Sequence, residues 1–159
     1  YLPLNHDYPG APTQLNFERA LSLFKPLLED PQQHKVGQNL KYDRHVLLNH
    51  GIDLQGIKHD TMLQSYVLDS TASRHDMNSL AEKYLDRTTI HFEDIAGKGK
   101  KQLTFNEIEI EHAGPYAAED ADITLQLHQA LWPQLEAIPN LQSLYQSLEI
   151  PLIPVINAS

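Results

Sequence analysis

Only two segments of this sequence resemble β-strands, and the rest of its regular pattern is helical. Short runs at residues 34–39 and 57–59 predict brief buried strands. Two strands alone do not make a stable sheet. The chain has 159 residues, which is enough for one compact domain with its own core. The sequence therefore predicts either an all-α domain or an α/β domain whose sheet lies mainly upstream of Tyr1.

The first half of the chain has three segments with helical spacing. Apolar residues recur at three and four over 16–29, although Pro26 is expected to kink the helix or end it early. A second helix is predicted over 41–50, and a third over 60–69 with Asp60 as its N-cap. The third helix is expected to bury Met62, Leu63, Tyr66 and Val67.

The second half is predicted to contain one short helix and one long interrupted helix. The short helix starts at Asp76 or Asn78 and ends near Leu85, and a mobile basic loop is expected over 97–101. Thr104-Phe-Asn-Glu107 has the spacing of a capping box that opens the next helix. Gly114-Pro115 is expected to break that helix and restart it, and the restarted helix is predicted to run to about Leu131.

Composition limits the classes of function. Lysine and arginine number 12 against 21 acidic residues, a net charge of −9, which argues against a domain that coats nucleic acid through basic residues. It does not exclude an enzyme that holds one strand end through metal ions. The chain has no cysteine, so a bound metal must use oxygen or imidazole ligands. No apolar stretch approaches the roughly 20 residues of a membrane helix, so we expect a soluble protein without a membrane partner.

Two short stretches carry side chains suited to metal-assisted chemistry. Gln38-Asn-Leu-Lys-Tyr-Asp43 lies at a predicted strand-to-helix junction, which places Asp43 in the first turn of a helix. In Tyr116-Ala-Ala-Glu-Asp120 the i, i+4 spacing places Tyr116 and Asp120 on one helix face. A phenol that orients water beside a carboxylate that binds Mg²⁺ suits phosphodiester hydrolysis. A core tyrosine beside an exposed acid gives the same spacing, so the pattern alone leaves both interpretations open.

Together these stretches resemble the second and third motifs of proofreading 3′-5′ exonucleases. Nearly the whole chain is similar to the exonuclease domain of bacterial DNA polymerase I, a family A DNA polymerase. The similarity implies a ribonuclease-H-like α/β fold, lacking its N-terminal strands and therefore mostly helical. The blocks that carry it are Lys35-Val-Gly-Gln-Asn-Leu-Lys-Tyr-Asp-Arg44, His59-Asp-Thr-Met62, Arg74-His-Asp-Met77, Phe92-Glu-Asp-Ile-Ala-Gly-Lys-Gly-Lys100 and Tyr116-Ala-Ala-Glu-Asp-Ala-Asp122.

The resemblance implies a role for each matching residue. Asp43 and Asp120 are expected to help hold two divalent ions, Mg²⁺ or Mn²⁺ with Zn²⁺ as an alternative, and Tyr116 is expected to orient the attacking water. The substrate implied is the 3′ end of single-stranded or frayed DNA, whose last nucleotides splay over aromatic, thioether and guanidinium groups. The implied DNA-binding residues are Gln38, Asn39, Tyr42, Met62, Arg74 and Phe92. Tyr42 and Met62 fit a core role equally well.

One feature of the family is absent. Its first motif, Asp-x-Glu, supplies two more carboxylates, and no Asp of this chain has Glu two places later. We therefore expect that motif upstream of Tyr1, metal ions bound weakly or not at all by this chain alone, and almost no activity. Residues 1–147 are predicted to be a partial exonuclease domain, and 148–159 the start of the connection to the polymerase domain of the same parent chain. Uncovered apolar faces predict local disorder or self-association, and the family implies a bacterial cytoplasmic protein that works at the nucleoid.

Two other functions remain open. His59-Asp60 and His75-Asp76 suggest a His-Asp metal phosphohydrolase, although Asp60 is better explained as a helix cap and His75-Asp76 as a turn into a helix. Some members of the polymerase family have lost their acids, so the domain can also be a non-catalytic partner of the polymerase domain. The three lysines at 98, 100 and 101 fit either a local phosphate contact or a solvated loop.

Overall fold

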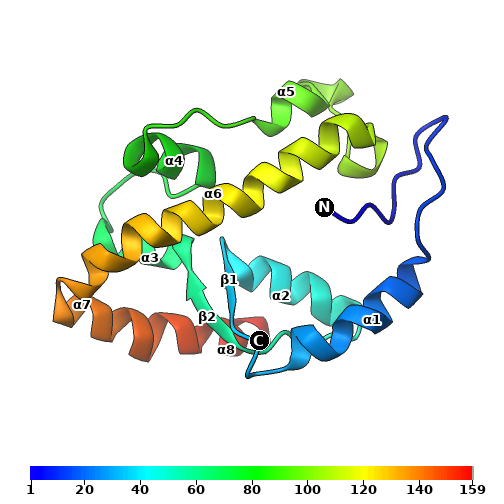
Figure 1. Cartoon of the computed structure of the whole chain (residues 1–159). Coiled ribbons are helices and arrows are strands. Elements are labelled where there is room, and N and C mark those ends of the chain that lie inside the picture. The colour runs from blue at the N-terminus through cyan, green and yellow to red at the C-terminus, as the bar shows by residue number, and fades with distance from the viewer. Residues whose placement is uncertain (159) are drawn as a thin grey trace.

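The computed structural model describes residues 1–158, so Ser159, the last residue of the predicted connecting segment, lies outside the described residues. Nothing is described for the side chains of residue 148 and residues 155–158. Helices surround a small sheet, and the long helix α6 (Ile110–Glu136) crosses one side of the molecule (Figure 1). This arrangement confirms the prediction of a mostly helical α/β fold.

The sheet consists of two parallel strands. β1 (Lys35–Gly37) pairs with β2 (Ile57–Asp60), and Gly37 lies opposite Asp60 in the register. Helix α2 (Leu40–Asn49) forms the connection that parallel strands require. Both strands and this helix were predicted within one or two residues.

Helix α1 (Phe17–Glu29) begins at its N-cap Asn16, whose side chain accepts the backbone N–H of Arg19. The expectation that Pro26 ends this helix early was wrong, because the helix continues to Glu29. A proline removes one backbone hydrogen bond. Pro26 and Ser22, one turn before it, are both exposed, so water can solvate the carbonyl that the proline leaves without a donor.

Helix α3 (Thr61–Leu68) has the predicted cap, since the Asp60 carboxylate accepts backbone N–H groups of its first turn. The predicted buried face was wrong. The fully buried residues are Thr61, Gln64 and Ser65, whereas Tyr66 is 45% exposed. Gln64 and Ser65 are buried because their side chains hydrogen-bond to His128 and His75 on other segments.

The predicted break at Gly114-Pro115 is also absent. α6 is continuous through Pro115 and ends at Glu136, five residues beyond the expected Leu131. The capping box at Thr104–Glu107 is present, but it opens the 3₁₀ turn η2 (Phe105–Glu107). Ile108 follows in an extended conformation and is 1% exposed, which ends the turn before α6 begins.

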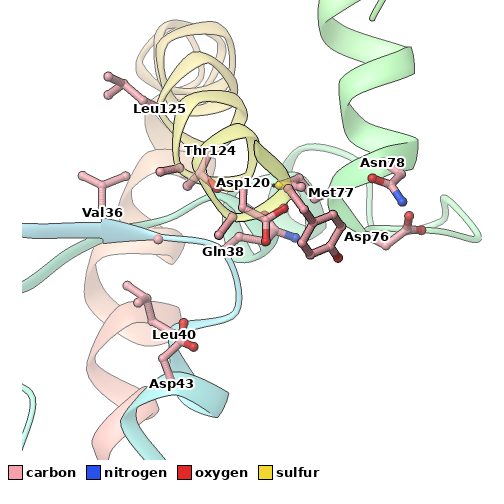
Figure 2. Close-up of a pocket in the computed structure, with 14 residues that line it drawn as sticks. Val36, Gln38, Leu40, Asp43, Asp76, Met77, Asn78, Asp120, Thr124 and Leu125 are labelled. Atoms are coloured by element: carbon pink, nitrogen blue, oxygen red, sulfur yellow. Dashed lines mark hydrogen bonds between the residues drawn. The ribbon is translucent and has the colours of Figure 1, made fainter. Parts of the chain in front are cut away.

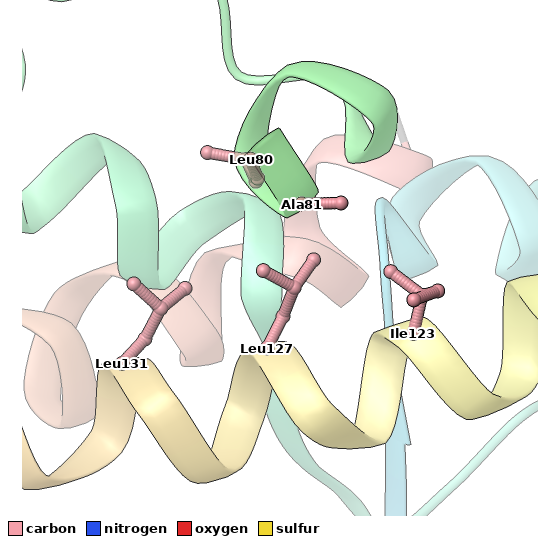
Figure 3. Close-up of a cluster of buried hydrophobic side chains, with 5 residues drawn as sticks. All are labelled: Leu80, Ala81, Ile123, Leu127 and Leu131. Carbon is pink, nitrogen blue, oxygen red and sulfur yellow. The ribbon is translucent and has the colours of Figure 1, made fainter. Parts of the chain in front are cut away.

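The main core lies between α6 and α4 (Met77–Leu85). It contains Leu80 and Ala81 from α4 and Ile123, Leu127 and Leu131 from α6 (Figure 3). A smaller cluster joins α5 (Phe92–Ala96) to the start of α6. The predicted basic loop at 97–101 contains the exposed 3₁₀ turn η1 (Gly99–Lys101).

The last helices form a C-terminal arm that returns to the sheet. The arm consists of α7 (Pro139–Leu144), the π-helical turn η3 (Tyr145–Glu149) and α8 (Ile150–Ala158). α8 packs against α2 and β2 (Figure 1). Within residues 1–158, no helix combines the length and the apolar character needed to span a bilayer.

Candidate active site

A cavity of about 680 Å³ lies where α6 faces the junction between β1 and α2. Figure 2 shows Asp43, from α2, and Asp120, from α6, on two sides of this hollow. Tyr116 also lines it, so the structure brings together the three residues predicted to be catalytic. The remaining lining residues are Val36, Gly37, Gln38, Leu40, Asp76, Met77, Asn78, Ala117, Ala121, Thr124 and Leu125.

The junction between β1 and α2 explains the position of Asp43. Asn39 adopts the left-handed conformation, with φ 60° and ψ 53°, and α2 begins at the next residue. A Cβ at Gly37 would lie 2.4 Å from Leu40 Cδ2, so a larger residue there would force the Leu40 side chain to move. This tight turn places Asp43 in the first turn of the helix.

On α6, Tyr116 and Asp120 lie one turn apart, as their spacing predicted. The Tyr116 ring packs between two other aromatic rings. Its centroid is 6.1 Å from that of Phe92 and 6.3 Å from that of Phe105. These contacts restrict the orientation of the tyrosine ring at the cavity wall.

No Lys or Arg is among the residues that line the cavity with Asp43 and Asp120. Burial raises the pKa of Asp120, and the Glu119 and Asp43 carboxylates raise it further. Burial also raises the pKa of Asp43, with a further contribution from Asp60. Burial, then Asp120 and Glu119, raise the pKa of the Tyr116 hydroxyl. The negative charge of Asp43 therefore disfavours ionisation of Asp120, and a bound cation would relieve that repulsion.

Comparisons with known proteins identify the family of the chain. A family model described as 3′-5′ exonuclease matches residues 1–136. The chain belongs to this exonuclease family. It is 63% identical over 158 residues to DNA polymerase I of Pseudomonas aeruginosa, covering 98% of this chain and 17% of the relative. It is 46% identical over 164 residues to DNA polymerase I of Rhizobium leguminosarum, covering 98% of this chain and 16% of the relative.

The chain thus spans about a sixth of the length of these curated relatives. A solved structure has a similar fold, with a TM-score of 0.68 and 23% sequence identity. It is described as the POL domain of Pol1 from M. smegmatis in complex with DNA primer-template and dNTP, and the match covers 92% of this chain and 22% of that one.

Four of the predicted DNA-binding residues of the exonuclease domain lie around a second pocket of about 470 Å³. It adjoins the first because Gln38, Asp76 and Met77 line both pockets. The four residues are Gln38, Asn39, Met62 and Arg74. Tyr42 and Phe92 line neither pocket, and Tyr42 is 63% exposed, which excludes the core role that the sequence allowed for it.

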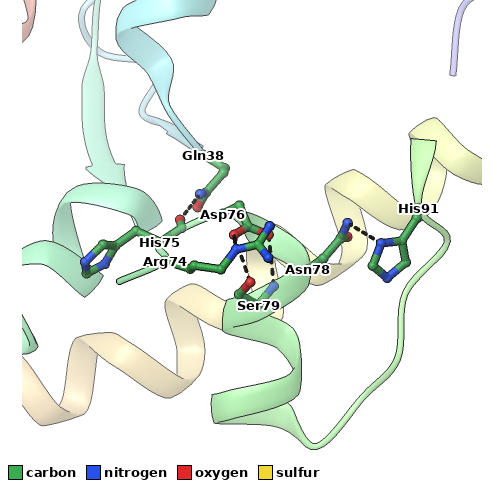
Figure 4. Close-up of polar contacts among 7 residues, drawn as sticks. All are labelled: Gln38, Arg74, His75, Asp76, Asn78, Ser79 and His91. Carbon is green, nitrogen blue, oxygen red and sulfur yellow. Dashed lines mark hydrogen bonds and ion pairs between the residues drawn. The ribbon is translucent and has the colours of Figure 1, made fainter. Parts of the chain in front are cut away.

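The Gln38 side chain is held by internal hydrogen bonds. Its Nε2 donates to the carbonyl of His75 at 3.0 Å (Figure 4). Its Oε1 accepts from the Thr61 hydroxyl. Gln38 therefore joins the end of β1 to the segment that carries Arg74. The Gln38 amide could contact a ligand directly only if it broke one of these hydrogen bonds and formed a new one to the ligand.

Asp76 and Asn78 were not among the predicted site residues of the exonuclease, yet both line the cavity. Asp76 caps α4 through Ser79 and also pairs with the Arg74 guanidinium at 3.1 Å (Figure 4). Burial raises the pKa of Asp76, but hydrogen bonds from Ser79 and the charge of Arg74 outweigh it and lower the pKa. In the sequence, the block Arg74-His-Asp-Met77 was the signal that connected this position to the exonuclease family.

The histidines do not assemble into the alternative metal centre. His59 packs against His128 and Trp132, whereas the His75 ring stacks on Tyr66. Among the described residues, no three His, Asp or Glu side chains are grouped closely enough to hold a metal ion. This finding applies to the main cavity as well, where Asp43 and Asp120 form a pair. Their carboxylate oxygens are the ligand type that Mg²⁺ and Mn²⁺ prefer, so the pair fits part of a metal site.

Proposed function

We propose that this chain is the proofreading 3′-5′ exonuclease domain of a bacterial DNA polymerase I. It would hydrolyse the last phosphodiester bond of single-stranded DNA or of a frayed primer end. The observation that carries the proposal is that Asp43, Tyr116 and Asp120 line one cavity in a chain of the exonuclease family. The relatives named DNA polymerase I support the parent enzyme and, with it, a bacterial cytoplasmic location at the nucleoid.

In this proposal Asp43 and Asp120 are ligands of two divalent ions, Mg²⁺ or Mn²⁺, with Zn²⁺ a further possibility. Such ions, when bound, lower the pKa of a water molecule and stabilise the leaving 3′ oxygen. The Tyr116 hydroxyl forms a hydrogen bond with the attacking water, as donor or as acceptor. Its raised pKa keeps the phenol protonated at neutral pH, so it orients water without adding negative charge.

The second pocket would receive the terminal nucleotides. Arg74 is the only Lys or Arg among the residues that line either pocket, which suits it to a phosphate. Met62 and Asn39 line the same pocket and would contact the splayed bases. Tyr42 and Phe92 would stack on nucleotides outside it, and Gln38 would act chiefly by holding the pocket wall.

Two aspartates are too few to hold two Mg²⁺ ions firmly. We propose that an Asp-x-Glu sequence upstream of Tyr1 supplies the other carboxylates, and that this chain alone is nearly inactive. The absence of Asp-x-Glu from the chain and its coverage of only a sixth of its relatives support this. Residues 148–159 would begin the connection to the polymerase domain, which is the partner of residues 1–147.

The test measures nucleotide release from a 3′-labelled single-stranded oligonucleotide in Mg²⁺ or Mn²⁺. It compares the chain, a version extended upstream through the next Asp-x-Glu, and the extended version with Asp120→Ala or Asp122→Ala. Asp122 is the matched control because it lies on the same helix, is 59% exposed and pairs with Arg87 outside the cavity. We expect the extended protein to digest the oligonucleotide from its 3′ end. Asp120→Ala should lower the rate of nucleotide release at least about a hundredfold, whereas Asp122→Ala should leave it unchanged.

Digestion by the short chain that Asp43→Ala abolishes would show that the upstream carboxylates are dispensable. An extended protein without activity would favour the second function, a non-catalytic domain that supports the polymerase domain. A loss of activity in Asp122→Ala equal to that in Asp120→Ala would assign the effect to α6 as a whole and not to the cavity.

A further inference from the structure

Asp60 carries a buried carboxylate that binds the starts of two helices at once. It is 1% exposed, and it ends β2. Its Oδ2 accepts the backbone N–H of Leu40 at 2.8 Å. Its Oδ1 accepts those of Asn39 at 3.2 Å, Met62 at 2.9 Å and Leu63 at 3.3 Å. One side chain therefore satisfies the first turns of α2 and α3 together.

Helix α2 depends on this distant residue because it has no cap of its own. Its N-cap Asn39 makes no side-chain capping bond and is in the left-handed conformation. Without Asp60, the N–H groups of Asn39 and Leu40 would lose their acceptor beneath the two pockets. The negative charge also lies at two positive helix ends, where it is favourable.

The same turn of α2 carries Asp43, three residues after Leu40. The charge of Asp60 contributes to the raised pKa of Asp43, after burial, so the two carboxylates are electrostatically coupled. Asp60 itself lines neither main pocket. It lines a cavity of about 110 Å³ beside α8 that shares Asn39 and Met62 with the second pocket, and its exposure of 1% keeps the carboxylate from direct contact with a strand end.

The C-terminal arm fixes the backbone of Asp60 from the other side. The Asp60 N–H donates to the Tyr145 hydroxyl at 2.9 Å, and Tyr145 is fully buried. Tyr145 lies beyond residues 1–136, the part that the exonuclease family model matches. The contacts thus run from the arm through Asp60 to the turn that presents Asp43.

We propose that Asp60 is a positioning residue of the exonuclease site, which holds the first turn of α2 so that Asp43 faces Asp120. The arm contributes through the bond from Asp60 to Tyr145. This inference rests on the proposed function for the identity of the site. It differs from a role in stability alone, because it requires a local effect on Asp43 that other helix caps do not have.

The test uses two substitutions with different charge. Asp60→Asn removes the charge and leaves one oxygen, whereas Asp60→Glu keeps the charge but moves the carboxylate by one methylene. Tyr145→Phe is a milder variant that changes no charge, and it keeps the test possible if the Asp60 variants do not fold. Asn16→Ala is the matched control, since it removes the N-cap of α1 away from both pockets.

The first measurement is amide hydrogen exchange by NMR on the chain. Faster exchange confined to residues 39–43 and 61–63 is expected in the Asp60 variants, and unchanged exchange there would overturn the proposal. The second is the Mn²⁺ concentration that broadens the Asp43 and Asp120 amide signals. We expect it to rise about tenfold in both Asp60 variants, less in Tyr145→Phe, and not at all in Asn16→Ala.

A normal Mn²⁺ response in Asp60→Glu would overturn the proposal, because the charge of Asp60 and not its geometry would then matter. In the extended protein, kcat is expected to fall at least about tenfold while KM for the oligonucleotide stays within about twofold. In the extended protein, an absence of activity or of Mn²⁺ broadening would count against the proposed function. The exchange measurement would still decide the role of Asp60.

Discussion

Two of the surfaces through which helix α6 contacts its neighbours differ in chemistry, and we call them the leucine seam and the histidine seam. The leucine seam joins it to α4 and consists of Leu80, Ala81, Ile123, Leu127 and Leu131 (Figure 3). The histidine seam joins it to β2, α3 and η3 and consists of His59, Gln64, His128, Trp132 and Tyr145. One side of α6 is therefore held by buried apolar surface, and the other by hydrogen bonds and ring contacts.

The contacts of the histidine seam depend on the orientation of its side chains. Gln64 Nε2 lies 3.0 Å from His128 Nδ1, and the Tyr145 hydroxyl lies 3.3 Å from His59 Nδ1. The two imidazole rings approach to 4.2 Å between centroids. Burial lowers the pKa of His128, which favours its neutral imidazole. Burial first, and His128 next, lower the pKa of His59 to about 4.

The two seams contribute differently to stability and to the positions of the elements. Apolar packing tolerates small shifts, so the leucine seam supplies stability without fixing the position of α6 closely. Hydrogen bonds fail when their partners move, so the histidine seam fixes where α3 and the C-terminal arm lie relative to α6. The arm in turn contacts Asp60, so the polar seam is the one connected to the active site.

The largest effect is expected from Leu127→Ala, which opens a hole in the leucine seam. Leu127 is fully buried, and such truncations cost about 2–5 kcal/mol of unfolding free energy. Leu125→Ala is the control on the same helix, because Leu125 is 51% exposed and should change stability by less than about 0.5 kcal/mol. Urea unfolding followed by circular dichroism measures both. Equal losses would mean that the seam does not dominate the core.

The two helices that form the leucine seam were predicted from local spacing, but the contact between them was not, because Leu80 and Leu127 are far apart in the sequence. The two strands, the Asp60 cap and the shared face of Tyr116 and Asp120 also follow from local spacing. The ends of α1 and α6 could not be predicted, since the effect of Pro26 or Pro115 depends on solvent access and on packing along the rest of the helix.

The histidine seam was missed because its partners are far apart in sequence. Gln64 and Ser65 look like solvent-facing residues until His128 and His75 are placed beside them. The site shows the same limit. Tyr116 and Asp120 are joined by spacing, but Asp43 is joined to them only by the family resemblance and the fold.

An intermediate effect is expected from Tyr145→Phe, which tests the histidine seam. The change keeps the ring but leaves the buried Asp60 N–H without its acceptor, at a cost of about 1–3 kcal/mol. Tyr42→Phe is the control, since Tyr42 is 63% exposed and its hydroxyl can bond to water. A Tyr145→Phe protein as stable as the unmutated one would mean that another group satisfies Asp60.

The smallest effect is expected from mild acid, and it should belong to the histidine seam alone. The pKa of His59 is about 4 in the folded chain against 6.5 for the free side chain, so the unfolded chain binds the proton first. Stability is therefore complete above pH 6.5 and falls as the pH drops toward 4, by less than about 1 kcal/mol at pH 6.

His59→Gln removes this titration, so its unfolding free energy should fall less between pH 7.5 and 6 than that of the unmutated chain. Buried carboxylates such as Asp60 and Asp120 have raised pKa values and act in the opposite direction, but they are present in both proteins and cancel in the difference. Leu127→Ala should keep the full pH dependence, since no leucine titrates. An identical pH slope in His59→Gln and the unmutated chain would place the acid sensitivity outside the histidine seam and remove the contrast between the two sides of α6.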